Sequence, residues 1–374
     1  MQQITRKFKI ISVVGARPNF MKVAPVHRAF AKYADRVEHH IVHTGQHYDA
    51  AMSDAFFSDL DMPAPSFFLG VGSGSHATQT AKIMTEFERV CLDMKPDFVM
   101  VAGDVNSTIG CSLTAVKLGI ATAHIEAGLR SFDRTMPEEI NRIATDAICD
   151  WLFVTEQSGM DNLLATGSPA ERVKFVGNTM IDSMHYAMPK AKASTILREL
   201  SLESKKYCLV TLHRPSNVDE PEQLRFLLET LADLSKHRKI VFPLHPRTRK
   251  NIERFGLQSL TEAAPGLLTI EPQGYVSFLA LMRSADFILT DSGGIQEETT
   301  ALGVPCLTLR DTTERPVTCE LGTNILIPPT SENIRSAIDT TLNGERKAGH
   351  IPPLWDGNAA ERIVEIIVNQ CLIP

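Results

Sequence analysis

Short apolar runs recur along the chain, and they alternate with segments whose apolar residues repeat at helical spacing. The runs are Ile10–Val14, His40–His43, Phe98–Ala102, Ala121–Ile125, Trp151–Val154, Val173–Val176, Cys208–Leu212, Ile240–Leu244, Leu267–Ile270, Phe287–Thr290 and Cys306–Leu309. Runs that are apolar almost throughout predict strands buried on both faces, and their alternation with helices predicts parallel sheets. We therefore expect an α/β protein built from doubly wound, Rossmann-like sheets.

The strand pattern pauses between about Met184 and Lys206, where Met188-Pro189-Lys190 is followed by a charged helical stretch. Each half of the chain carries five or six of the predicted strands. We therefore place a domain boundary in this segment. The chain ends in a further predicted helix from Gly357 to about Cys371, in which apolar residues recur at helical spacing.

Composition and charge exclude some classes of function but do not identify one. The 374 residues are 43% hydrophobic and 22% charged, with a formal net charge of −6. An acidic balance argues against a nucleic-acid partner, although a local pocket can still hold an anion. The seven Cys residues form no Cys-x-x-Cys pair, which favours reduced thiols and no metal. No signal peptide or long apolar stretch is apparent, so we expect a cytoplasmic protein without membrane contact.

Two polar loops follow predicted strands of the first half, and ligands of parallel sheets bind beyond the carboxyl ends of strands. Gly15-Ala16-Arg17-Pro18 opens a helix, and Arg17 and Lys22 could help its amides to hold an anion. A solvated helix start explains the same pattern. The loop that contains Gln46 and His47 could touch substrate or form a packed turn.

Three carboxylates of the first half stand where a catalytic group would. Asp104 follows a strand and precedes a helix, so it is either catalytic or a helix cap. Glu126 ends an apolar strand, as a catalytic acid or as the partner of Arg130 or Arg142. Glu138 shares a helix face with Asn141 and Arg142, while a second stripe is expected to be buried. That stripe consists of Ile140, Ile143, Ala144, Ala147 and Ile148.

The second half places cations and glycines after its strands. His213 follows one strand, and His245-Pro246-Arg247 repeats the pattern after the next. Asp291-Ser292-Gly293-Gly294 leads from a strand into a predicted helix at 295–302, whose amides could hold a diphosphate. Glu298 lies one helical turn further on, within reach of an attached ribose. The loop from Arg310 to Arg315 adds two guanidinium groups suited to phosphate.

Together these segments resemble the non-hydrolysing UDP-N-acetylglucosamine 2-epimerases over nearly the whole chain. The resemblance rests on Gly-Ala-Arg-Pro, Gly-Asp-Val-Asn-Ser-Thr, His-Ile-Glu-Ala-Gly-Leu-Arg-Ser, Met-Pro-Glu-Glu-Ile-Asn-Arg, Thr-Leu-His-Arg, Thr-Asp-Ser-Gly-Gly-Ile-Gln-Glu-Glu and Leu-Arg-Asp-Thr-Thr-Glu-Arg-Pro, in this order. It implies a glycosyltransferase B-type fold, in which two Rossmann-like domains, residues 1–188 and 189–355, face each other across a cleft. Residues 356–374 would form a helix that packs back on the first domain. A homodimer that interconverts UDP-GlcNAc and UDP-ManNAc without NAD, metal or other cofactor is also implied.

The resemblance also implies roles for individual residues. Positions matching UDP contacts are Arg17, His213, Gln273, Phe278, Ser292, Gly293, Gly294, Glu298 and Arg315, and Arg142 is expected beside the substrate. Lys22, Asp104, Glu126 and Glu138 match the catalytic carboxylates and their neighbour, with His213 acting on the leaving phosphate. Gln46, His47 and His245 match a site for a second, activating UDP-GlcNAc, but Tyr48 and Pro215 stand where many members have Arg.

Other functions remain open from sequence. The Thr-Gly-Gln-His-Tyr-Asp loop also resembles that of relatives acting on 2,3-diacetamido uronic acid sugars. A hydrolysing epimerase would release ManNAc. A glycosyltransferase would need an acceptor groove where this chain gathers carboxylates, and a non-catalytic sensor would have no use for those carboxylates.

Overall fold

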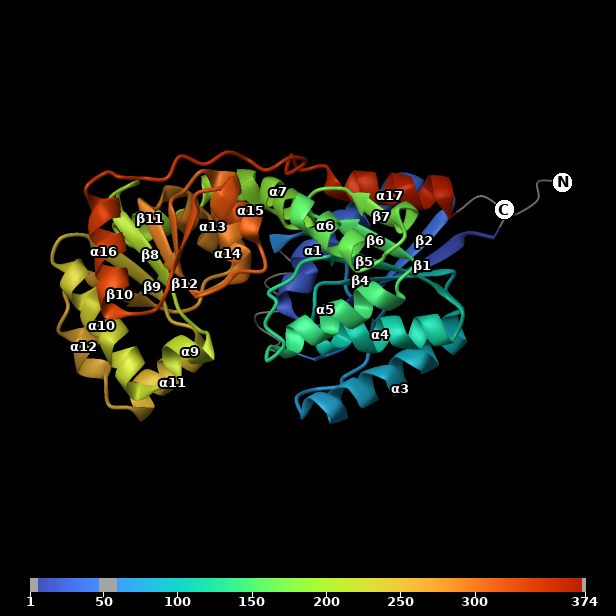
Figure 1. The fold of residues 1–374 in the computed structure, drawn as a ribbon, viewed down its shortest axis with the longest axis horizontal. Coiled ribbons are helices and arrows are strands. Elements are labelled where there is room, and N and C mark those ends of the chain that lie inside the picture. The colour runs from blue at the N-terminus through green and yellow to red at the C-terminus, as the bar shows by residue number, and fades with distance from the viewer. Residues whose placement is uncertain (1–5, 47–58, 372–374) are drawn as a thin grey trace. The chain divides into compact units, whose positions relative to one another are not determined.

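The computed structural model describes residues 6–46 and 59–371. The chain divides into two compact units, Met1–Tyr186 with Pro353–Pro374 (unit 1) and Ala187–Pro352 (unit 2). Each unit contains one parallel sheet with helices on both of its faces (Figure 1). Among the described residues, no helix is long and apolar enough to cross a membrane.

In the described part of unit 1, the sheet has seven strands in the order β3-β2-β1-β4-β5-β6-β7. The strands are β1 (Phe8–Val14), β2 (Val37–His43), β3 (Phe67–Phe68), β4 (Phe98–Ala102), β5 (Ala121–Ala127), β6 (Trp151–Val154) and β7 (Val173–Phe175). All neighbouring pairs are parallel. The order reverses between β1 and β4, and the loops that leave a sheet at such a switch point diverge and make room for ligand.

Both faces of the unit 1 sheet are covered. The helices are α1 (Arg17–Phe30), α3 (His76–Met94), α4 (Asn106–Lys117), α5 (Pro137–Ile148), α6 (Gln157–Ala165), α17 (Ala359–Gln370) and the first part of α7 (Thr179–Ala193), which continues into unit 2 at Ala187, with 3₁₀ turns at Ala31–Tyr33 and Ala170–Arg172. Ile11 and Val13 of β1 pack with Phe87 of α3. Ser12 points to the other face, where it contacts His39, which in turn contacts His27 of α1. This two-sided burial explains why the strand is apolar without alternation.

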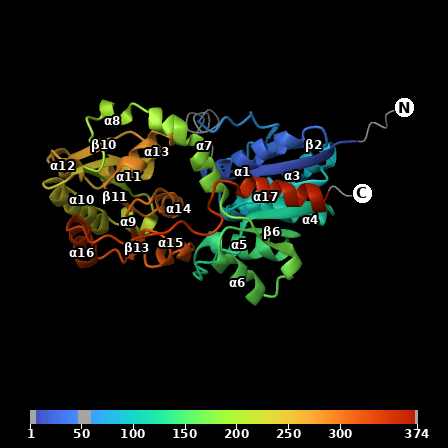
Figure 2. The ribbon, with the colours of Figure 1, turned by 90° about the horizontal axis from the view of Figure 1, so that it is seen from above.

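The end of the chain is attached to unit 1, where α17 lies beside α1 (Figure 2). Asp182 of α7 accepts hydrogen bonds from the amides of Ala359 and Ala360, at 3.2 and 2.7 Å. Trp355 is buried and donates to the carbonyl of Thr155 at 2.9 Å. A carboxylate at a helix N-terminus satisfies amides that the helix itself leaves without partners.

Unit 2 repeats the architecture with six strands among its described residues, in the order β10-β9-β8-β11-β12-β13. They are β8 (Tyr207–Thr211), β9 (Lys239–Pro243), β10 (Leu267–Ile270), β11 (Phe287–Thr290), β12 (Cys306–Leu309) and β13 (Asn324–Ile327). Its helices are α8 (Ile196–Glu199), α9 (Pro215–Val218), α10 (Pro221–Ser235), α11 (Pro246–Arg254), α12 (Gln258–Glu262), α13 (Tyr275–Ser284), α14 (Gly293–Leu302), α15 (Pro316–Glu320) and α16 (Ser331–Leu342). Leucines of α10 and isoleucines of α16 share one core with β8.

Strands β3 and β13 were not expected from the sequence. Strand β3 has only two residues, too few for a periodic signal. Strand β13 reads Asn-Ile-Leu-Ile and lies at the sheet edge, where Ile325 is 39% exposed. All of the strands that the sequence did predict are present within a few residues of their expected bounds.

Candidate active site

Asp104 and Glu126 lie at the carboxyl edge of the unit 1 sheet, on neighbouring strands. Ala102, the last residue of β4, pairs with Ile125 of β5. Asp104 comes two residues after that pair, and Glu126 comes one residue after it. The parallel register therefore brings these carboxylates, which are distant in sequence, to the same edge.

Glu126 has a backbone conformation that is rare for a residue with a side chain, with φ at +72°. The register of β5 against β6 shifts between Ile125 and Ala127, and such a bulge turns a side chain away from its regular direction. The side chain is buried and forms an ion pair with Lys22 of α1. The salt-bridge alternative named Arg130 and Arg142 as partners of Glu126. In the structure Arg130 pairs with Asp146, and Arg142 pairs with Asp104 and Glu139.

Lys22 and Glu126 converge with Asn19 above Gly103. A Cβ at Gly103 would lie 2.9 Å from Lys22 Nζ, 3.4 Å from Asn19 Nδ2 and 3.7 Å from Glu126 Oε2. The φ of +69° at this residue also favours glycine. The turn between β4 and α4 thus leaves room for the buried ion pair.

The loop from β1 to α1 is the segment for which the sequence left open an anion site or a solvated helix start. Asn19 Oδ1 accepts hydrogen bonds from the amides of Gly15 and Ala16, at 3.1 and 2.9 Å. These two amides therefore already have an acceptor. The ammonium of Lys22 is directed to Glu126. Arg17 is the first residue of α1.

Asp104 does not cap a helix, so that alternative is wrong. Helix α4 has Val105 at its N-cap position, without a side-chain capping bond. The Asp104 carboxylate, 29% exposed, instead pairs with the guanidinium of Arg142 on α5. Asn141 donates to the Asp104 carbonyl at 2.9 Å. Two successive residues of α5 therefore hold Asp104 in place.

The carboxylate that faces Arg142 on its own helix is Glu139. Its Oε2 lies 2.5 Å from Arg142 Nη1 and also accepts from the amide and hydroxyl of Ser131. Burial alone would raise the pKa of Glu139, but the bonds from Ser131 and Arg142 outweigh it and hold the pKa below its ordinary value. Glu138 is exposed in the first turn of α5. The prediction that Glu138 is the carboxylate against Arg142 is therefore wrong.

The predicted apolar stripe of α5 is also wrong. The buried residues of this helix are Glu139, Arg142, Thr145 and Asp146, whereas Ile140 is 40% exposed. A polar face is buried here because its charged groups find partners in the loop that follows β4, on β5 and in the loop that follows β5.

Behind these groups lies a buried charged network that the sequence did not reveal. His124 Nε2 donates to the Gly103 carbonyl at 2.7 Å, and Nδ1 lies 2.7 Å from Asp146 Oδ1. The other oxygen of Asp146 accepts from Arg130 at 2.6 Å and from the Gly128 amide. Burial would raise the pKa of Asp146, but the bonds from His124 and Arg130 hold it low. The network thus anchors Gly103, the residue before Asp104.

In unit 2, Asp291 organises the loop that carries His213. Asp291 is fully buried and accepts from the amides of His213 and Arg214 and from Asn217 Nδ2. Its Oδ1 also lies 3.0 Å from Nδ1 of the partly exposed His213 ring. Burial would raise the pKa of Asp291, but the bonds from His213 and Arg214 lower it. Asp291 belonged to the motif, but only the structure shows that it positions His213.

Helix α14 begins two residues earlier than expected, so Gly293 and Gly294 are its first residues. Ser292 occupies the N-cap position without a side-chain capping bond. A Cβ at Gly293 would lie 2.9 Å from both Arg315 Nη1 and Glu314 Oε1. A guanidinium thus lies against the start of a helix, the combination that binds phosphate.

Arg315 belongs to a buried cluster of opposite charges. It pairs with Glu314 at 2.5 Å and with Glu297 at 3.0 Å, and Arg310 pairs with Glu314 at 2.9 Å. Burial would raise the pKa of Glu314, but Arg315 and Arg310 hold it far below its ordinary value. Gln296, also buried, bonds to Thr313 and thereby joins α14 to this loop. The two arginines are therefore rigidly placed.

The other predicted ligand residues of unit 2 occupy varied positions. Glu298 is buried and accepts from the hydroxyl of Tyr275 at 2.6 Å. Gln273, before α13, donates to the Glu271 carbonyl, and Phe278 lies on α13, half-buried. His245 caps α11 by accepting from the amide of Arg247, and its ring packs against that of His213.

Gln46 has a structural role in the described part of the chain. Its Oε1 accepts from the amide and hydroxyl of Ser107, at 2.9 and 2.7 Å, and so satisfies the start of α4. His47 lies outside the described residues.

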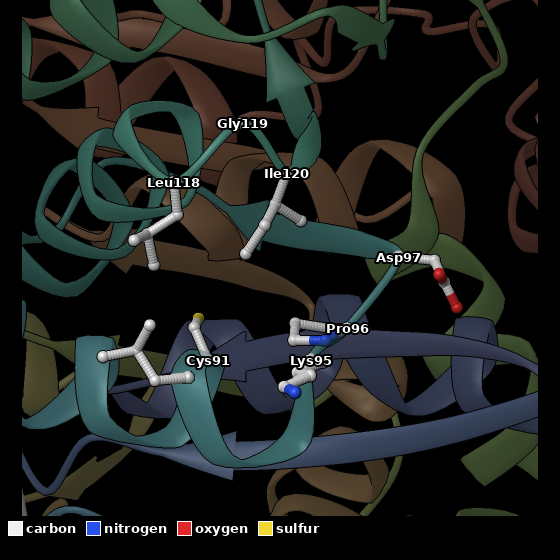
Figure 3. Close-up of a pocket in the computed structure, with 8 residues that line it drawn as sticks. Cys91, Lys95, Pro96, Asp97, Leu118, Gly119 and Ile120 are labelled. Atoms are coloured by element: carbon white, nitrogen blue, oxygen red, sulfur yellow. The ribbon is translucent and has the colours of Figure 1, made fainter.

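An open pocket of about 430 Å³ lies at the opposite edge of the unit 1 sheet, before β4 and β5 (Figure 3). Leu92 and Cys91 of α3 and Leu118 and Ile120 beyond α4 line it. None of the predicted site residues in the described part of the chain contributes to its wall. Within residues 6–46 and 59–371, no group of three or more His, Cys, Asp or Glu is placed to hold a metal ion.

Comparison with known proteins agrees with this geometry. The model of the UDP-N-acetylglucosamine 2-epimerase family matches residues 30–368. A UDP-N-acetylglucosamine 2-epimerase of Methanocaldococcus jannaschii is 42% identical, covering 96% of this chain and 98% of the relative. The UDP-2,3-diacetamido-2,3-dideoxy-D-glucuronate 2-epimerase of Pseudomonas aeruginosa is 39% identical, covering 96% and 99%. The crystal structure of the M. jannaschii UDP-GlcNAc 2-epimerase in complex with UDP-GlcNAc and UDP has a TM-score of 0.89 and covers 97% of this chain and all of that one.

Proposed function

The chain belongs to the UDP-N-acetylglucosamine 2-epimerase family, and we propose from that premise that it interconverts UDP-GlcNAc and UDP-ManNAc. The reaction inverts the configuration at C2 of the sugar. It proceeds by elimination of UDP to a glycal, followed by re-addition of UDP with a proton delivered to the other face of C2. No NAD, metal or other cofactor takes part.

Elimination explains why the site needs both carboxylates and cations. The C2 proton of the sugar is weakly acidic, because no carbonyl group is adjacent to C2 within the ring. Loss of UDP from C1 allows the C2 proton to leave as a C1–C2 double bond forms. A base must take the proton from one face and an acid must return one to the other. The departing diphosphate needs positive charge and amide donors.

Unit 1 supplies the proton-transfer groups in this proposal. Asp104 and Glu126 exchange the C2 proton, and Glu138 assists from α5. Lys22 keeps the buried Glu126 carboxylate paired, and Arg142 does the same for Asp104. The position of these two ion pairs on adjacent strand ends is the observation that carries the proposal, because inversion at C2 needs proton-transfer groups that reach both faces of one carbon.

Unit 2 supplies the nucleotide site in this proposal. The amides of Gly293 and Gly294 and the guanidinium of Arg315 bind the diphosphate, and His213 protonates or steadies its leaving oxygen. The remaining proposed contacts to UDP are Arg17, Gln273, Phe278, Ser292 and Glu298. Retention of UDP after the sugar bond breaks allows the same molecule to be returned.

Incubation with UDP-GlcNAc in deuterated water, followed by NMR, tests the proposal. Deuterium at C2 of UDP-ManNAc is the expected result. Free ManNAc and UDP would indicate a hydrolase, and the absence of turnover with UDP still bound would contradict an epimerase of this sugar. The same assay with UDP-2,3-diacetamido-2,3-dideoxy-D-glucuronate tests the substrate of the P. aeruginosa relative.

Replacement of Glu126 by Gln tests the division of roles. It should abolish deuterium exchange while UDP affinity, measured by calorimetry, stays nearly unchanged. Loss of UDP binding would show that the role given to Glu126 is wrong. We also propose, from the family resemblance, that the enzyme acts in the cytoplasm as a homodimer, which light scattering can test for its oligomeric part.

A further inference from the structure

Phe132 combines two unfavourable features at the edge that carries the catalytic carboxylates. Its backbone φ is +59°, a left-handed conformation that a bulky side chain rarely adopts. Its side chain is 78% exposed, so burial of the ring does not compensate for the strain. Strained residues persist where the surrounding structure imposes them, and they concentrate at functional sites.

A buried carboxylate imposes this conformation. The amide of Phe132 donates to Glu139 Oε1 at 3.0 Å, and the preceding amide, of Ser131, donates to Glu139 Oε2 at 2.9 Å. Glu139 is 1% exposed. The backbone of Phe132 is thus fixed by the buried Glu139 carboxylate, while the ring points away from the core of unit 1.

The same carboxylate connects Phe132 to the proposed site. Glu139 Oε2 pairs with Arg142, and the other terminal nitrogen of Arg142 pairs with Asp104. The loop also begins directly after β5, whose penultimate residue is Glu126. The strained backbone of Phe132 is therefore linked through Glu139 and Arg142 to Asp104, one of the two carboxylates proposed to act on C2.

We propose that the Phe132 ring packs on the sugar of the bound UDP-sugar, and this inference rests on the proposed function. One face of a pyranose presents C–H groups, which aromatic rings contact favourably. The glycal is flatter around its double bond and exposes more apolar surface than either substrate. The ring therefore stabilises the glycal relative to the substrates. It also excludes water and keeps the glycal bound until UDP returns.

The variant Phe132→Gly separates a role in catalysis from a role in folding, because its stability should rise while its activity falls. Glycine relieves the left-handed backbone, so the melting temperature of the variant should rise by about 2 °C. Loss of the ring should lower kcat/KM for epimerisation roughly tenfold, about 1.4 kcal/mol. The released glycal, measured by NMR, should increase relative to epimerised product. Phe132→Tyr should retain both activity and low glycal release.

Lys95→Gly is the matched control, because Lys95 is another exposed, left-handed residue of unit 1, at the far end of α3. It should gain stability without a change in activity. If the wild-type protein shows no exchange at C2, the proposed function fails, and this inference fails with it. If the wild type is active and Phe132→Gly keeps its kcat/KM and low glycal release, only the inference on Phe132 is overturned. Dissociation of a dimer by Phe132→Gly, seen by light scattering, would assign the ring to a subunit contact and overturn the inference equally.

Discussion

Replacement of Glu139 by Gln is expected to destabilise unit 1 by about 3–5 kcal/mol, because the substitution breaks a buried charge pair. Glu139 is 1% exposed and accepts from two backbone amides, the Ser131 hydroxyl and Arg142. Loss of the charged bond to Arg142 costs about 1.5–3 kcal/mol. The new amide group also points hydrogens at one or more of the remaining donors, which adds about 1–3 kcal/mol.

Glu138→Gln is the matched control, since Glu138 precedes Glu139 on the same helix turn but is exposed. Its effect on unfolding should stay within about 0.5 kcal/mol. Urea denaturation followed by tryptophan fluorescence measures both, because the two tryptophans, Trp151 and Trp355, lie in unit 1. Equal unfolding free energies for the two variants would refute the assignment of Glu139 as the buried anchor.

The pH dependence of the free energy of unfolding tests the same assignment of Glu139 independently. The pKa of Glu139 is lowered in the folded protein, so its stabilising contribution is complete above the unfolded value of 4.5 and is lost as pH falls through the folded pKa. Glu139→Gln should lack this component. If the free energy of unfolding of Glu139→Gln fell with decreasing pH as it does for the wild type, the pairing of Glu139 with Arg142 would be contradicted.

Gly128→Ala should destabilise unit 1 by several kcal/mol in urea, because φ is +82° and the new Cβ would lie 2.3 Å from the Gly159 carbonyl oxygen; an unchanged midpoint would contradict this packing. Burial lowers the pKa of His43 from 6.5 to about 4, so below pH 6.5 the unfolded chain binds a proton that the folded protein does not. The free energy of unfolding should therefore be unaffected by His43 above pH 6.5 and should fall by about 2 kcal/mol between pH 7 and pH 5. His43→Asn should flatten that pH dependence of unfolding, and an unaltered slope would count against it. Gly293→Ala should weaken UDP binding about tenfold in calorimetry by displacing Arg315, with tryptophan-monitored unfolding of unit 1 unchanged; wild-type affinity would argue against phosphate at this helix start.

Local pattern was sufficient for most of the strands and for the placement of Asp104, Glu126, His213 and Gly293. Apolar runs record burial on two faces, and a polar residue directly after such a run must leave the sheet at its carboxyl edge. The strands that this reasoning missed, β3 and β13, are a two-residue strand and a partly exposed edge strand. Neither has enough continuous burial to leave a signal in the sequence.

The sequence by itself determined two parallel α/β sheets and the strand ends at which chemistry could occur. Only the tertiary structure decided which charged groups pair. Glu139, not its neighbour Glu138, faces Arg142, and the ammonium of Lys22 forms an ion pair with Glu126. Helical spacing cannot distinguish such neighbours, because a buried polar face is stable only when other segments of the chain supply partners for it. For α5 those partners, Asp104 and His124, lie 38 and 22 residues away from the residues they contact, Arg142 and Asp146.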